Sequence, residues 1–307
     1  MSDLFTDLDN SSSKVVPPNI ELKQEQVQAP WERGAYLATD TGVGQFAPCV
    51  VRYGVRPQWL QGCLGWNGAI LMVPSSSSNV PQGIGCTLAS ALSGGSLSHP
   101  AMAASPLFTS ARRTKLTATG TGGGRAEVYS QQTIAWRGTP GGYGGFYFCT
   151  RFALQIATTP LGGDPPPNQF GFVGLQAAIT AIGGTSPINN PNQLGIGADG
   201  TSANLGIYHN DSTAVSGRQD LGTDYAIDGE NSSKLIQFEM FCKPAASAVY
   251  FRVQRLDSPL IPPFLFSKNV QLPASNIFLA FHAYVNNGTV GGGPSVHLVR
   301  TYVESDI

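Results

Sequence analysis

Four carboxylates lie close together in one segment, and their chemistry is the easiest in the chain to name. They are Asp220, Asp224, Asp228 and Glu230. Two carboxyl groups held about 5 to 9.5 Å apart hydrolyse glycosidic bonds, one of them acting as the acid. The Gly and Asn residues of 219–231 instead indicate a solvated loop, and the ligand spacing of a calcium loop is not matched. We therefore predict no catalytic residue and no metal site.

Histidines and glycines offer two further kinds of chemistry. The four histidines are spread over unrelated segments, at His99, His209, His282 and His297. A Ser-His-Asp site can be assembled from distant residues, but the sequence has no G-x-S-x-G elbow. We expect structural roles, with His282 and His297 as a cross-strand pair on adjacent strands. The glycine run 119–124 is not followed by the helical pattern that a phosphate-binding loop needs, so no cofactor and no enzymatic activity are predicted.

Composition excludes several kinds of partner. The net charge is −1, and the densest basic group (Arg112, Arg113 and Lys115) is too small for nucleic acid, so we expect a solvated strand edge or loop there. No stretch approaches the roughly 18 apolar residues of a membrane helix. The acidic first residues are unlike a secretory signal. Five cysteines without paired spacing indicate reduced thiols. We predict synthesis in a cytoplasm, with no nucleic acid and no membrane insertion.

The elements that must position any site are β-strands. Charged residues make up only 12% of the chain, which leaves few of the residues that favour the outer faces of helices. Short runs rich in aromatic and β-branched residues are separated by turns of Gly, Asn, Asp, Ser and Pro. They lie at 127–129, 146–154, 170–175, 194–197, 205–208, 235–241, 249–255 and 296–303. This pattern predicts an all-β fold, a jelly-roll-like antiparallel β-sandwich.

The chain divides into three regions by composition. We predict an extended N-terminal arm over residues 1–30, an N-terminal β region over 31–130 and the C-terminal sandwich over 131–307. Residues 31–130 are either the opening strands of the same sandwich or a small companion β domain. They include a long loop of small residues at 88–104.

The arm is too polar to bury a core, but it carries Leu4, Phe5 and Leu8. A purely solvating tail would not need these apolar residues. We favour an anchoring peptide that orders on a partner, with a disordered tail as the alternative.

The C-terminal half presents its motifs in a particular order. The order begins with an aromatic strand that runs into an Arg (146–152), Phe-Val-Gly-Leu at 172–175 and Asn-Gln-Leu-Gly-Ile-Gly at 192–197. It continues with a strand and Asn-Asp turn (207–212), Asp-Leu-Gly (220–222), a strand (235–241) and the end of an Arg-bearing strand (254–256). It closes with Asn-Asn-Gly (286–288) and the end of the last strand (302–304). This order resembles the jelly-roll domains that end fibre and receptor-binding proteins of tailed bacteriophages. The likeness covers about half the chain, and the chain departs from the longer fibres in having no heptad run.

The resemblance implies a virion protein that assembles as a homotrimer. Its arm 1–30 would attach to other virion proteins, and its sandwich would bind a glycan of the host surface. Low charge and abundant Ser, Thr and Asn suit contacts with sugar hydroxyls. The candidate ligand contacts are on loops, at Tyr143, Asn286 and Asn287, and ordinary hairpin turns are the alternative for them.

Three functions remain open at this point. The first is a short trimeric tail fibre or spike that binds the host surface. The second is a head fibre, cement or adaptor protein of the virion with no receptor. The third is a tailspike-like enzyme that degrades glycans with the carboxylates of the 220–230 loop.

Overall fold

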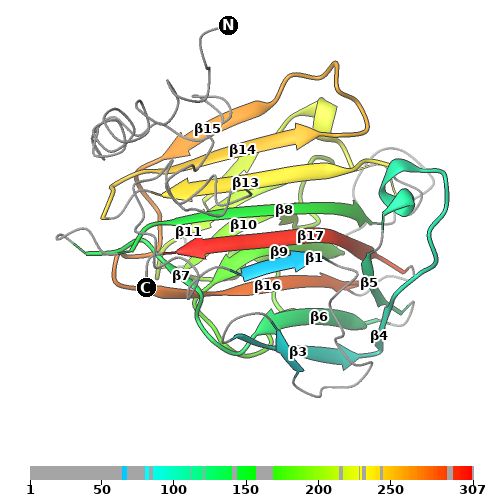
Figure 1. The fold of residues 1–307 in the computed structure, drawn as a ribbon, viewed down its shortest axis with the longest axis horizontal. Coiled ribbons are helices and arrows are strands. Elements are labelled where there is room, and N and C mark those ends of the chain that lie inside the picture. Colours follow the sequence, from blue (N-terminus) through cyan, green and yellow to red (C-terminus); the bar gives the residue numbers. More distant parts are fainter. Residues whose placement is uncertain are drawn as a thin grey trace, which may run out of the picture.

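The chain forms a β-sandwich of two antiparallel sheets (Figure 1). The structure is a computed structural model, and it describes residues 64–67, 80–82, 86–111, 113–119, 122–139, 144–156, 169–213, 217–227, 229, 233–242, 245–288 and 293–305. Three short 3-10 helices lie in these ranges, at Leu107–Ser110, Pro187–Asn189 and Thr223–Tyr225. None of the described residues belongs to a helix long and apolar enough to cross a membrane.

The eight-stranded sheet faces the viewer in Figure 1. Its order is β15 (Phe264–Lys268), β14 (Val249–Arg255), β13 (Ile236–Cys242), β8 (Phe146–Gln155), β17 (Ser295–Ser305), β5 (Thr114–Ala118) and β4 (Gly95–Ser98). The eighth strand, β1 (Leu64–Asn67), pairs with a part of β17 that β5 does not reach. The last strand of the chain therefore lies in the interior of this sheet.

The nine-stranded sheet forms the second layer. Its order is β12 (Arg218–Asp220), β11 (Gly206–Asn210), β10 (Gln193–Ala198), β9 (Phe170–Gln176), β16 (Phe278–Asn286), β6 (Arg125–Ser130), β3 (Cys86–Ser93) and β2 (Val80–Gln82), and β7 (Ala135–Trp136) pairs with β16. Consecutive strands β9 to β12 form a meander, whereas β16 arrives from much later in the chain.

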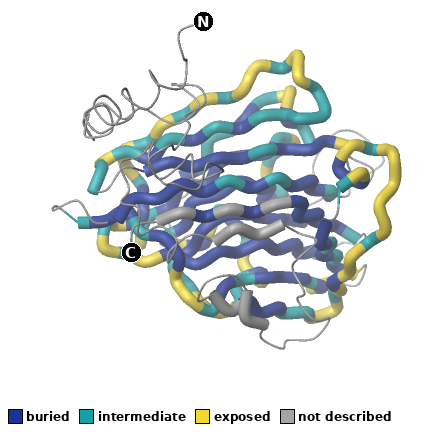
Figure 2. The backbone as a smooth tube through the Cα atoms, viewed as in Figure 1, coloured by how far each residue is buried: buried dark blue, intermediate teal, exposed yellow. Residues whose placement is uncertain are grey.

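Alternation along the strands builds the core between the two sheets. Phe146, Phe148 and Phe152 of β8 are fully buried in the main hydrophobic cluster, which also contains Phe281 of β16. The rings of Phe148 and Phe281 stack with centroids 6.3 Å apart, so they join the two layers. Each such ring contributes about 1.5 to 3 kcal/mol by leaving water. Figure 2 shows these strands as buried, with exposed residues in the surrounding loops.

Gly174 of β9 and Gly195 of β10 make room for an aromatic ring on the outer face of the nine-stranded sheet. A Cβ at Gly195 would lie 2.4 Å from Cζ of Phe172, and a Cβ at Gly174 would lie 2.8 Å from the same atom. No side chain fits at those distances. The Leu-Gly-Ile-Gly sequence is therefore needed for close packing.

The predicted all-β antiparallel sandwich is confirmed, and each strand predicted from the ladder of short runs is present with small shifts at its ends. The prediction of a long loop at 88–104 is wrong for residues 88–98, whereas residues 99–104 lie outside strands and helices. Leu88 and Leu97 belong to β3 and β4, which turn at Gly94 with a φ of 60°. Small residues have a weak intrinsic preference for strands. They form strands here because burial against neighbouring strands outweighs that preference.

Residues 86–130 contribute strands to both sheets. β4 and β5 extend the eight-stranded sheet, and β3 and β6 extend the nine-stranded sheet. This part of the predicted region 31–130 therefore supplies strands of the same sandwich rather than a companion domain. The predicted arm, residues 1–30, lies outside the described residues.

The outer faces of the two sheets differ in what covers them. Segment 177–191 packs over the nine-stranded sheet, where Ile182 and Ile188 contact a cluster of buried rings: Phe170, Phe172, Tyr208 and Tyr284. Segment 99–113 covers one end of the eight-stranded sheet, with Phe108 packed on Ala153, Leu235 and Val299. The strands β8, β13 and β14 carry the polar residues at the other end of that sheet.

Candidate functional site

Three cross-strand rows of side chains lie on the outer face of β8, β13 and β14. The pairing register gives the rows Arg151–Gln237–Gln254, Cys149–Glu239–Arg252 and Tyr147–Phe241–Tyr250. Directly opposed side chains on one face of a sheet are close enough to interact. We call these nine residues the open face.

Glu239 is the centre of the open face. Its carboxylate accepts hydrogen bonds from the Tyr147 hydroxyl (2.7 Å), Gln237 Nε2 (2.7 Å) and Arg252 Nη1 (2.5 Å). Only 6% of its side chain is exposed, whereas 19% of the Arg252 side chain is exposed. A buried carboxylate with three donors is held in a single arrangement, because each lost hydrogen bond to a charged group costs about 1.5 to 3 kcal/mol.

The network extends from Glu239 across the strands. Arg252 Nη2 donates to Gln254 Oε1 at 2.6 Å, and Arg151 Nε donates to Gln237 Oε1 at 2.8 Å. These planar groups are therefore fixed before any ligand arrives. A fixed array of donors and acceptors is what a polar ligand needs, since little side-chain entropy remains to be lost on binding.

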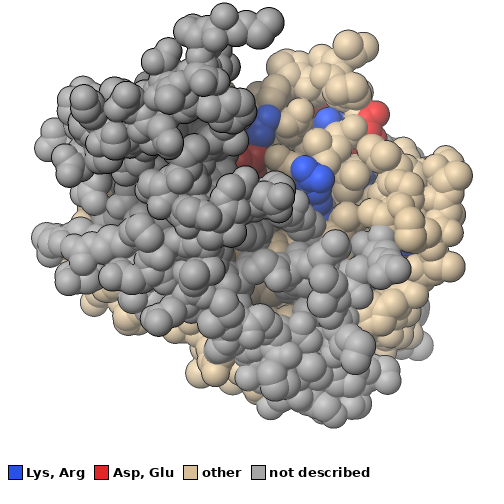
Figure 3. Space-filling view, in the orientation of Figure 1, with Lys and Arg blue, Asp and Glu red and all other residues tan. Residues whose placement is uncertain are grey.

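An aromatic row and an exposed leucine flank the polar rows. The rings of Phe241 and Tyr250 stack with centroids 6.2 Å apart, and Tyr250 is half-buried. Leu265 of β15, which is opposite Arg252 in register, is 56% exposed. Figure 3 shows basic and acidic side chains close together on this side of the molecule. The planar polar groups of the open face thus lie beside apolar surface that Tyr250 and the neighbouring Leu265 supply, whereas Phe241 is fully buried.

The covered end of the same sheet contains Arg113, which was expected to be solvated. That prediction is wrong: Arg113 is 6% exposed. Its Nη1 donates to the carbonyls of Thr109 and Ala101, and its Nε donates to His297 Nδ1 at 3.2 Å. The guanidinium holds segment 99–113 on the sheet because it joins carbonyls of that segment to His297 of β17. Arg112 lies outside the described residues.

His297 is held neutral in this cluster. Burial, together with the charges of Lys115 and Arg113, lowers the pKa of His297 to about 3. Nδ1 accepts from Arg113, so the proton is on Nε2, which faces Gln155 Oε1 at 3.1 Å. Ser295 Oγ lies 3.4 Å from the same Nε2. A nitrogen that carries the proton cannot take one from a hydroxyl, so this serine and histidine do not form a nucleophilic pair.

His282 does not pair with His297. The two histidines lie in β16 and β17, which belong to different sheets, so the predicted cross-strand pair is wrong. The sequence shows two apolar strands near the C-terminus but not which sheet each one joins. His282 instead contacts Glu127 of β6, with Nδ1 2.8 Å from Oε1.

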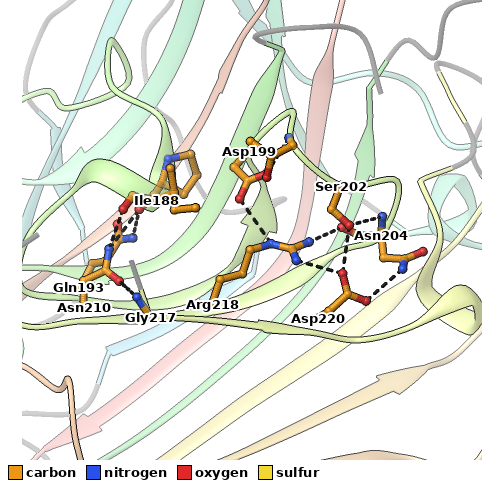
Figure 4. Close-up of polar contacts among 11 residues, drawn as sticks. Ile188, Gln193, Asp199, Ser202, Asn204, Asn210, Gly217, Arg218 and Asp220 are labelled. Carbon is orange, nitrogen blue, oxygen red and sulfur yellow. Dashed lines mark hydrogen bonds and ion pairs between the residues drawn. The ribbon is translucent and has the colours of Figure 1, made fainter. Parts of the chain in front are cut away.

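The acidic segment is only in part the solvated loop that the sequence predicts. Asp220 is in β12, where its carboxylate accepts hydrogen bonds from Arg218, Ser202 and Asn204 (Figure 4). Partial burial acts to raise its pKa, but these bonds and that from the Gly222 amide lower it to about 2. Asp220 is therefore a fixed anion. A general acid needs a raised pKa.

The other carboxylates of this segment do not complete a catalytic pair in the described part of the chain. Asp224 is exposed in a 3-10 helix, and Asp228 and Glu230 lie outside the described residues. Asp199, which the sequence did not single out, lies 3.3 Å from Arg218 in the same cluster. Among the described residues, no group of three or more His, Cys, Asp or Glu side chains could hold a metal ion.

The two asparagines predicted as ligand contacts are buried. Asn286 Nδ2 donates to the Gly183 carbonyl, its Oδ1 accepts from the Gly288 amide, and Asn287 Nδ2 donates to the Thr119 carbonyl. These bonds shape the turn after β16, and neither side chain is exposed to a ligand.

The remaining predicted site residues lie outside the described residues. They are Tyr143, Leu4, Phe5 and Leu8, and their predicted roles stay predictions.

The open face was missed although the sequence carries a signal for it. Gln237 and Glu239 alternate with apolar residues in one strand, and Arg252 and Gln254 do so in the next. Period-two alternation places each pair on one face. The register that joins them to Arg151 comes only from the folded sheet.

Comparisons with known proteins agree on the fold alone. No protein-family model matches the chain, and no curated protein matches it in sequence. The solved structure of lectin UEA-II complexed with galactose is 10% identical, with a TM-score of 0.47, over 80% of this chain and 99% of that chain. A protein of unknown function from Shewanella oneidensis MR-1 is 9% identical, with a TM-score of 0.47, over 80% and 86%. Peanut lectin with a 9mer peptide is 9% identical, with a TM-score of 0.43, over 71% and 97%. The two-sheet β-sandwich of this chain is shown by its own strand order.

Proposed function

We propose that the chain binds glycans through the open face. The observation that carries this proposal is the hydrogen-bonded set centred on Glu239, in which the half-buried groups of Arg151, Gln237, Arg252 and Gln254 are fixed beside Tyr250. Sugars present hydroxyl groups at fixed angles and apolar ring faces. Planar amide and guanidinium groups satisfy the hydroxyls, and an aromatic ring contacts the ring face.

We further propose that this glycan site belongs to a bacteriophage particle. The order of motifs in the C-terminal half supports a short fibre or spike, with the sandwich directed to a polysaccharide of the host surface and residues 1–30 attached to other virion proteins. In this proposal the chain is made in the host cytoplasm, assembles as a homotrimer and has no enzymatic activity. The low pKa of Asp220 supports the last point only for one role, because a carboxylate that stays ionised cannot be the general acid of a glycosidase.

The test is retention of the purified full chain on polysaccharides extracted from candidate host surfaces. We expect binding by the native chain and loss of binding in Arg252→Ala. The matched control is Arg255→Ala, which removes an arginine paired with Asp257 at the end of the same strand. Equal binding by both variants and the native chain would contradict the proposed site. Light scattering then tests the trimer, since a mass near the 32.3 kDa of one chain would exclude it.

A virion role without a receptor is the second candidate. In that case the chain binds no polysaccharide, and particles that lack it adsorb normally but lose stability. Adsorption of particles carrying Arg252→Ala separates the two functions, since only a receptor-binding protein makes adsorption depend on this side chain.

A further inference from the structure

We propose that the ligand of the open face is an acidic saccharide, and that a carboxylate of the sugar binds Arg151. This inference rests on the proposed glycan-binding function and adds the chemical class of the ligand. It follows from the charges of the open face, from the contacts that already occupy each charged group, and from the geometry of the guanidinium group.

The charges of the open face do not balance. The face has two guanidinium groups, Arg151 and Arg252, and one carboxylate, Glu239; its other members are neutral. The adjoining strand β17 continues the rows with one residue of each charge, Arg300 opposite Arg151 and Glu304 opposite Tyr147, and so leaves the difference unchanged. The charge of Glu239 is already paired with Arg252, and its carboxylate also accepts hydrogen bonds from Tyr147 and Gln237. One positive charge on this face therefore has no counter-charge among the side chains that form the network.

That charge belongs to Arg151. Its Nε donates to the neutral oxygen of Gln237 at 2.8 Å, and no carboxylate of the described residues lies within ion-pair distance of it. The two arginines of β14 each face an acid: Arg252 pairs with Glu239 at 2.5 Å, and Arg255 with Asp257 at 2.5 Å. Arg151 is half-buried, where the interaction between charges is stronger than in open solvent.

The geometry of Arg151 suits a carboxylate. Because Nε is bound to Gln237, the guanidinium plane is fixed and its two Nη groups form the remaining fork. A carboxylate accepts two parallel hydrogen bonds from such a fork. Gln237 is itself bound to Glu239, so the arginine is oriented by the same network that orders the rest of the face.

The size of the charge limits the ligand class. One uncompensated guanidinium is too little for nucleic acid, which needs contacts with several phosphates. It is enough to select a polysaccharide that carries one carboxylate per sugar or per repeat. Neighbouring hydroxyls of the same polymer would meet the amides of Gln237 and Gln254.

The test compares uronic acid polysaccharides with their own carboxyl-reduced forms. The full-length chain is applied to immobilised polygalacturonate, alginate and hyaluronate, to the carboxyl-reduced form of each, and to a panel of neutral polysaccharides. We expect binding to at least one acidic polymer, about tenfold weaker binding after its carboxyl groups are reduced, and weakening by added salt.

Two variants assign the effect to Arg151. Arg151→Gln should weaken binding to the acidic polymer about tenfold and leave binding to its reduced form unchanged. Arg255→Gln, which removes the same charge outside the open face, should bind like the native chain. Should Arg151→Gln fail to fold, the comparison of native and reduced polymers still decides the ligand class.

The possible failures are distinguishable. Binding to neutral polysaccharides that is unaffected by carboxyl reduction and by Arg151→Gln overturns the acidic ligand and leaves the glycan-binding function standing. Absence of binding to every polymer, acidic and neutral, overturns the glycan-binding function itself together with this inference.

Discussion

Each sheet carries a buried glutamate on its outer face, Glu127 on β6 and Glu239 on β13, and each carboxylate accepts several hydrogen bonds. Glu127 accepts from the backbone amides of Ile182 and Gly183 and lies 2.8 Å from His282 Nδ1. The donors to Glu239 are side chains of the sheet itself. Glu127 therefore binds the covering segment 177–191 to its sheet, whereas Glu239 fixes the positions of side chains within its own sheet.

The difference lies in which groups satisfy each carboxylate. The outer face of β9, β16 and β6 under segment 177–191, which we call the closed face, satisfies its glutamate with backbone groups of that segment. The ligand-sized surface there is already filled by Ile182 and Ile188. On the open face, two of the three donors to the glutamate, Gln237 and Arg252, are only half-buried. These are the two side chains that the proposed ligand would contact.

The largest effect expected from this comparison is a loss of stability in Glu127→Ala. The substitution leaves two buried amides and His282 without their acceptor, which costs about 3 to 5 kcal/mol of unfolding free energy. Urea unfolding measures the loss. The matched variant Glu239→Ala should cost less, because its donors lie at a half-exposed face and can turn to water. Equal losses of unfolding free energy in the two variants would show that both glutamates stabilise the fold to the same extent.

A second prediction concerns the covered end of the eight-stranded sheet. His297 has a pKa of about 3 in the folded chain and an ordinary value of 6.5, so the unfolded chain takes up its proton first as the pH falls. This contribution to stability is complete above pH 6.5 and is lost progressively towards pH 3. Between pH 6.5 and pH 5 the loss is about 2 kcal/mol.

Thermal or urea unfolding across that pH range measures the effect of His297. In His297→Gln, which keeps an oxygen to accept from Arg113, the slope of stability against pH should become smaller. An unchanged slope would mean that other groups cause the pH dependence. His209, whose pKa burial also lowers, contributes in the same direction and remains in the variant.

The sequence predicts the layers well because they depend on local alternation. The run at 249–255 alternates apolar and polar residues, and it forms β14 with the predicted bounds. The sequence predicts the partners of charged residues poorly. Tyr147 and Glu239 are 92 positions apart, and no local pattern shows that their strands are neighbours. Arg113 was misjudged for the same reason: its partner His297 is 184 positions away.

The third prediction tests the open face by a change of charge without a change of shape. Glu239→Gln weakens the hold on Arg252 and Tyr147 and should reduce polysaccharide binding about tenfold, which corresponds to about 1.4 kcal/mol. Equilibrium binding to a polymer that the native chain retains measures this. Asp257→Asn, which removes a carboxylate paired with Arg255 away from the open face, serves as the control. Reduced binding in the control alone would place the ligand elsewhere.

The smallest expected effect comes from removing one hydroxyl on each face. Tyr284 OH accepts from Asn190 Nδ2 at 3.0 Å on the closed face, and Tyr147 OH donates to Glu239 on the open face. Each Tyr→Phe substitution should lower the unfolding free energy by about 1 to 2 kcal/mol, because one hydrogen bond typically contributes about 1 kcal/mol net and the Tyr284 hydroxyl also donates to the Thr185 carbonyl at 3.3 Å. Their consequences for binding should differ, because only Tyr147 orients the carboxylate that fixes Arg252.

Tyr147→Phe should therefore weaken polysaccharide binding a few-fold, and Tyr284→Phe should leave it unchanged at equal stability. Comparing both affinities at a temperature where both variants are folded removes stability as an explanation. Parallel losses of affinity in the two variants would mean that binding follows overall stability. A loss confined to Tyr147→Phe would mean that the Tyr147 hydroxyl acts on binding through Glu239. Both substitutions remove a phenolic hydroxyl, but only the Tyr147 hydroxyl binds the carboxylate of the open face.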